Sequence, residues 1–151
     1  MIKPHPNDYA KLYEGMAGEM SLQARVEVSR DNLEQHLSWC DLMISEDSTA
    51  GLEGLIAGKP LIHAHFASSP PVLPFVAYGA AASGFDAESL KAAIGVAAAG
   101  KMQQSHLGRL RFIDDSAGPM DGQAGGRLTA LIRELAGSDV CPDVSAGGHM
   151  A

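Results

Sequence analysis

Apolar positions follow two alternating patterns along the chain, and their order predicts strands that lead into helices. Strands are predicted where Val26 and Val28 alternate with polar residues and in the apolar runs 41–45 and 61–66. Apolar residues at helical spacing, together with capping residues, predict helices over 7–20, 31–40, 49–57, 86–99 and 122–136. Strands alternating with helices favour an α/β fold, a Rossmann-like parallel sheet of about four or more strands with helices on both faces.

Length and composition limit the number of domains and the class of protein. The 151 residues, 46% of them hydrophobic, suffice for about one domain with a real core. We expect this domain to span 1–136, because 137–151 is rich in Gly, Ser, Asp and Pro and is typical of a flexible tail. The first residues read as the end of a strand with nothing before it, so we expect part of a larger protein to be missing.

Charge and cysteine content exclude several partners. A net charge of −7 argues against nucleic acid, whose phosphates are bound by clustered Lys and Arg. Cys40 and Cys141 are far apart and form no CxxC pair, so neither a disulfide framework nor a zinc knuckle is indicated. No apolar stretch is long enough to span a membrane, and no signal peptide is recognisable. We therefore expect a cytoplasmic protein.

The turn between the second predicted strand and its helix is the first candidate binding site. Ligands of parallel sheets bind at the carboxyl ends of strands, where helix amino termini present free N–H groups to phosphate. Here the hydroxyls of Ser48 and Thr49 and the amides of Thr49, Ala50 and Gly51 are candidates for a phosphate or diphosphate. Glu53, further along the helix, is placed to accept hydrogen bonds from ribose. The alternative is that Ser48 only caps the helix and Glu53 is solvated.

Histidines supply the other candidates. His5 lies between Pro4 and Pro6 at a strand end, where it is suited to donate to phosphate or to act as an acid or base. Alternatively, it is a loop histidine bonded to the local backbone. His63 and His65 face the same side of a predicted strand, which permits metal binding in principle. Because no third ligand is evident, placement in the core or at an edge is favoured, and we expect no metal.

Several common catalytic motifs are absent. The chain contains no GxSxG elbow, no P-loop and no GxGxxG sequence. Common hydrolases, nucleotide triphosphatases and dehydrogenases are therefore not indicated.

Three segments together resemble a known family: K-P-H-P at residues 3–6, C-D-L-M-I-S-E-D-S-T-A-G-L-E-G-L-I-A-G-K-P-L-I at 40–62, and D-G-Q-A-G-G-R-L at 121–128. The chain is similar to the carboxyl-terminal, nucleotide-sugar-binding half of GT-B-fold proteins. Bacterial surface and capsular polysaccharide glycosyltransferases are the most similar members, and UDP-N-acetylglucosamine 2-epimerases are related. The resemblance covers 1–136, and its most specific part is 41–62.

The resemblance implies roles for individual residues. It assigns the donor diphosphate to Ser48 and Thr49, the ribose hydroxyls to Glu53, and a position near the phosphates to His5, which would assist departure of the nucleoside diphosphate. GT-B enzymes of this type generally need no metal or other cofactor, and the chain has no Asp-x-Asp motif. The epimerases usually carry Ser-Gly-Gly where this chain has Ser48-Thr49-Ala50, which favours the glycosyltransferase.

The implied partners are a nucleoside diphosphate sugar and the missing amino-terminal acceptor domain. A 2-epimerase-like fragment is the first alternative. A non-catalytic binding module is the second, in which an apolar face on residues 61–80 would bind a partner or a second copy of the chain.

Overall fold

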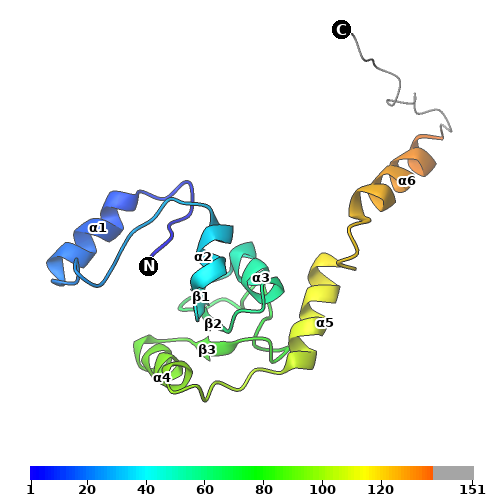
Figure 1. The fold of residues 1–151 in the computed structure, drawn as a ribbon. Coiled ribbons are helices and arrows are strands. Elements are labelled where there is room, and N and C mark those ends of the chain that lie inside the picture. Colours follow the sequence, from blue (N-terminus) through cyan, green and yellow to red (C-terminus); the bar gives the residue numbers. More distant parts are fainter. Residues whose placement is uncertain (138–151) are drawn as a thin grey trace, which may run out of the picture. The chain divides into compact units, whose positions relative to one another are not determined.

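The computed structural model describes residues 1–137, and it divides the chain into two compact units (Figure 1). The first unit is Met1–Ile113 and the second begins at Asp114. The boundary falls within one helix, whose last turn belongs to the second unit. The predicted tail at 137–151 lies almost wholly outside the described residues, so its flexibility stays a prediction.

Helices and strands are interspersed along the first unit. The helices are α1 (Ala10–Glu19), α2 (Leu33–Trp39), α3 (Thr49–Ile56), α4 (Ala87–Ala98) and α5 (His106–Ala117), and the strands are β1 (Met43–Ser45), β2 (Leu61–Ala64) and β3 (Ala82–Gly84). Helix α6 (Ala124–Ala136) follows in the second unit. Every predicted helix therefore has a counterpart, although the boundaries differ by a few residues.

The three strands form a parallel sheet in the order β1-β2-β3, which confirms the α/β class. The sheet is smaller than expected, because the described residues contain no fourth strand. Around Val28, pairing is limited to one isolated bridge with Ile2. The N–H groups of Arg25 and Val26 both donate to the Leu22 carbonyl, so a turn occupies the beginning of the predicted strand.

Two elements were not expected from the sequence. Strand β3 reads Ala-Ser-Gly and has no β-branched or aromatic residue, so local preference does not predict it. Its extended form depends on pairing with β2, and a Cβ at Gly84 would lie 3.1 Å from Leu90 of α4. Helix α5 has a weak apolar period, interrupted by Gly108 and several charged residues.

The core of the first unit lies between the sheet, α3 and α5. Its largest fully buried side chains are Phe75, Phe112, Leu55, Leu61 and Ile62. The rings of Phe75 and Phe112 are 4.7 Å apart between centroids. Gln104, which precedes α5, connects β2 to the segment before β3, because its Nε2 donates to the carbonyls of Leu61 at 2.8 Å and Ala80 at 3.0 Å.

In the second unit, an ion pair joins Asp121, just before α6, to Arg127 near the start of that helix. Arg127 Nη1 donates to both carboxylate oxygens of Asp121, at 2.9 and 2.8 Å, which gives the 121–128 segment a structural role. The apolar stripe of α6 is exposed, and it consists of Leu128, Leu131, Ile132 and Leu135. Across residues 1–137, every helix is too short or too polar to cross a membrane.

A capping box at the start of α4 predicts a dependence of stability on pH. Asp86 Oδ1 accepts from the Ser89 N–H at 2.7 Å, and Ser89 Oγ accepts from the Asp86 N–H at 3.0 Å. Hydrogen bonding of the Asp86 carboxylate by the backbone N–H and the side chain of Ser89 holds its pKa below the ordinary value of 3.8. Because the unfolded chain binds this proton more readily, the contribution of Asp86 is fully present above about pH 4 and is lost as the pH falls through the lowered folded pKa.

The Asp86→Asn variant is the control for this effect, because asparagine also caps helices but does not titrate. Chemical denaturation across the acid range is expected to show a steeper loss of unfolding free energy in the wild type than in Asp86→Asn. Parallel curves for the two proteins would contradict the prediction.

Candidate functional site

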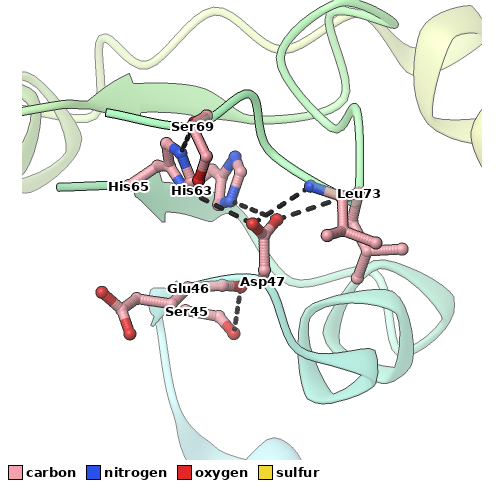
Figure 2. Close-up of polar contacts among 8 residues, drawn as sticks. Ser45, Glu46, Asp47, His63, His65, Ser69 and Leu73 are labelled. Carbon is pink, nitrogen blue, oxygen red and sulfur yellow. Dashed lines mark hydrogen bonds and ion pairs between the residues drawn. The ribbon is translucent and has the colours of Figure 1, made fainter. Parts of the chain in front are cut away.

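The carboxyl ends of β1 and β2 bring two polar segments together at one edge of the sheet. Strand β1 ends at Ser45 and is followed by the turn 46–48 that leads into α3. Strand β2 ends at Ala64 and continues through His65 into the loop 66–74. Because β1 and β2 are parallel neighbours in register, both polar segments leave the sheet at the same edge (Figure 2).

Ser48 caps α3, as the alternative interpretation of this turn predicts. Its backbone is extended, at φ −135° and ψ 140°, and Oγ accepts from the Ala50 N–H at 3.2 Å. The Gly51 N–H donates to the Ser48 carbonyl at 2.9 Å. Two of the three predicted phosphate-binding amides are therefore already engaged within the turn. Thr49, which is exposed, retains a hydroxyl and an amide at the first position of the helix.

Gly51 has a packing reason to lack a side chain. Its backbone amide is one of the predicted phosphate-binding groups, but the residue is buried in the structure. A Cβ at this position would lie 2.8 Å from Cζ of Phe75. Gly54, one turn later, is likewise buried, and a Cβ there would overlap Met43 Sδ. Both glycines thus allow α3 to lie close to the core.

Glu53 and His5 have different surroundings. Glu53 is exposed on α3, so its carboxylate is open to a ligand. His5 is also exposed, and its Nδ1 accepts from the Asn7 N–H at 3.2 Å. The His5 N–H donates to Asp8 Oδ2 at 3.2 Å. These contacts match a loop histidine bonded to the local backbone, and none of them joins His5 to the Ser48 turn.

Asp47 is the residue at this edge that the sequence analysis missed. Its Oδ1 lies 3.2 Å from His63 Nε2 and its Oδ2 lies 3.3 Å from His65 Nδ1. The same oxygens accept from the backbone N–H groups of Leu73 and Val72, each at 3.1 Å. The sequence offered no evident third metal ligand beside His63 and His65. In the structure, Asp47 of the β1–α3 turn occupies that position.

The pKa of the Asp47 carboxyl is lowered by its partners. Desolvation at the sheet edge by itself raises this pKa. The backbone N–H groups of Leu73 and Val72 and the charges of His63 and His65 lower it, and together they outweigh the effect of desolvation. Asp47 is therefore an anion at neutral pH, and it fastens the loop 66–74 to the end of β1.

Two surface hollows lie away from this edge. One, of about 310 Å³, is lined by Ala77, Tyr78, Ser105, Leu107, Gly108 and Arg111. The other, of about 420 Å³, is formed by Met1, residues 23–27 and Trp39. Both are shallow and contain none of the predicted site residues. The sheet edge remains the candidate site because it gathers the chemically versatile side chains.

Comparisons of the chain with family models, with curated proteins and with solved structures found no match. The family resemblance of the sequence therefore stays a prediction, and the function must be argued from the residues themselves.

Proposed function

We propose that this chain is the nucleotide-diphospho-sugar-binding domain of a cytoplasmic glycosyltransferase, a Rossmann-like GT-B half that acts in bacterial surface polysaccharide synthesis. One observation carries the proposal: the Ser48-Thr49 turn joins β1 to the amino terminus of α3 at the carboxyl edge of a parallel sheet. This is the place where sheets of this type bind phosphate groups.

The chemistry of the turn suits a diphosphate. The Thr49 amide and hydroxyl face solvent at the positive end of α3, where a phosphate oxygen accepts from both. Glu53, one turn further along and exposed, accepts hydrogen bonds from ribose hydroxyls. As the glycosidic bond to the donor breaks, negative charge grows on the departing diphosphate, and these donors stabilise it.

His5 is assigned a supporting role in this proposal. It would donate a proton or a hydrogen bond to the departing nucleoside diphosphate. A partner domain would bring the acceptor to this edge and close the cleft.

The test is the binding of nucleoside diphosphates to the full chain. Isothermal titration with UDP, CDP, GDP and ADP is expected to identify one ligand that binds with measurable heat. The Glu53→Ala variant should bind that ligand about tenfold or more weakly, because it loses hydrogen bonds to a charged acceptor. The Thr49→Ala variant should also bind more weakly, and it keeps the Ser48 cap intact.

Glu88→Ala is the matched control, because Glu88 is also an exposed glutamate on a helix, in the first turn of α4. It should bind as the wild type does. Equal affinities for wild type and Glu53→Ala, or the absence of binding by all four nucleotides, would overturn the proposal. The second result would favour the non-catalytic binding module instead.

A further inference from the structure

Asp47, His63 and His65 present three potential metal ligands to one point at the carboxyl edge of the sheet (Figure 2). One ligand atom from each residue lies within 4.8 Å of the other two. The two distances from the carboxylate to the imidazoles are 3.2 and 3.3 Å. The first distance ends on Oδ1 and the second on Oδ2, and each is close to the ~3.3 Å that separates two ligands bound at about 2.0–2.1 Å to a tetrahedral zinc ion.

The hydrogen bonding of His65 leaves its other nitrogen facing an acceptor. His65 Nε2 lies 2.7 Å from the Ser69 carbonyl oxygen, which can only accept, so Nε2 carries the hydrogen. In the neutral ring, Nδ1 then has a lone pair. That lone pair faces Asp47 Oδ2 at 3.3 Å, where two acceptors meet with no hydrogen of the neutral ring between them. A cation placed between them, either a second proton on the ring or a metal ion, turns this repulsion into attraction.

His63 gives a second, independent indication. Its side chain is 2% exposed, and the Phe75 ring packs edge-on against it with centroids 5.2 Å apart. The buried Nε2 has no hydrogen-bond partner, because its approach to Asp47 Oδ1 at 3.2 Å lacks the direction that a hydrogen bond requires. A buried polar atom without a partner is costly, and a metal ion would satisfy it.

The hydrogen bonds around His65 and Asp47 resemble those that hold metal-binding side chains in place in other proteins. Metal-binding histidines usually donate their second N–H to a carbonyl or carboxylate, as His65 does to Ser69. Ligating carboxylates are usually hydrogen-bonded as well, and Asp47 accepts from Val72 and Leu73. Each carboxylate oxygen retains a further lone pair for a metal. Two of the three potential ligands, Asp47 and His65, are thus oriented by one loop.

We propose that Asp47, His63 and His65 form a binding site for a divalent cation of the Zn²⁺ class. Two imidazoles and one carboxylate suit Zn²⁺, Co²⁺ or Ni²⁺, whereas Mg²⁺ and Ca²⁺ prefer oxygen ligands. Three protein ligands leave a fourth position for water or for an oxygen of a bound molecule. The proposal does not depend on nucleotide binding, and it replaces the expectation from sequence that the chain holds no metal.

The experiment is a titration of the chelator-treated full chain with ZnCl₂, followed by calorimetry, with MgCl₂ in a parallel titration. The wild type is expected to bind Zn²⁺ and to gain thermal stability as Zn²⁺ is added, because a ligand of the folded state stabilises it. No corresponding effect is expected from Mg²⁺. The affinity for Zn²⁺ should fall at least tenfold in His65→Ala and in Asp47→Asn.

Asp47→Asn keeps an oxygen that can accept from the loop backbone, so it serves as a second variant if His65→Ala fails to fold. Circular dichroism checks the fold of each protein. His106→Ala, at the exposed start of α5, is the control for scattered binding to surface histidines and should retain wild-type affinity. The proposal is overturned if the wild type binds no Zn²⁺, or if folded Asp47→Asn binds it as tightly as the wild type.

Discussion

Replacing Phe75 by alanine is expected to lower the free energy of unfolding by about 3–5 kcal/mol, the range measured for large buried aromatic residues. Phe75 is 0% exposed, and it lies between the Phe112 ring and the ring of His63. Helix α3 also packs closely against the Phe75 ring, because a Cβ added at Gly51 would lie 2.8 Å from Cζ of Phe75. Truncation would therefore open a cavity where the sheet, α3 and the candidate site meet. Urea denaturation monitored by circular dichroism measures the loss.

Val72→Ala is the matched control, because Val72 lies three residues earlier and its side chain is 81% exposed. Its backbone N–H, which donates to Asp47, is unaffected by the substitution. Unfolding free energy should change by no more than about 0.5 kcal/mol. If Phe75→Ala were as mild as this control, Phe75 would not be a central core residue.

Gly108→Ala is expected to have the second largest effect, a loss of about 2–3 kcal/mol or more. Gly108 is buried in α5, and a Cβ there would overlap the backbone carbonyl oxygen of Tyr78. A backbone atom cannot turn aside as the end of a side chain can, so the helix must move away from residues 75–80. The measurement is the midpoint of thermal unfolding.

Gly95→Ala tests whether this loss comes from the close contact or from alanine itself. Gly95 lies within α4, is exposed, and has no atom within 4 Å of an added Cβ. Alanine should therefore raise stability by about 0.5–1 kcal/mol through its better helix propensity. A change of the same sign in Gly95→Ala and Gly108→Ala would contradict the steric explanation.

Part of the candidate site could be predicted from local sequence signals, and part of it could not. Ser48 was placed correctly before α3, because a serine ahead of an apolar helical period is a local signal. The same local signal cannot say which amides remain free, and Ser48 itself engages those of Ala50 and Gly51. His63 and His65 were placed on one strand, but their third partner is Asp47, sixteen residues before His63. No spacing rule joins them, because the contact depends on β1 and β2 being neighbours.

What the sequence determined by itself is the type and order of most elements within residues 1–137: five of the six helices described there, strands β1 and β2, and therefore the α/β class. These follow from apolar period, caps and breakers, which act within a few residues of the chain. Tertiary structure alone decided the rest. Strand β3 is extended because β2 pairs with it, the strand predicted around Val28 is reduced to one bridge, and Asp47 meets two histidines because parallel strand ends share an edge. Such contacts join distant residues, and their energies become available only when the chain has folded.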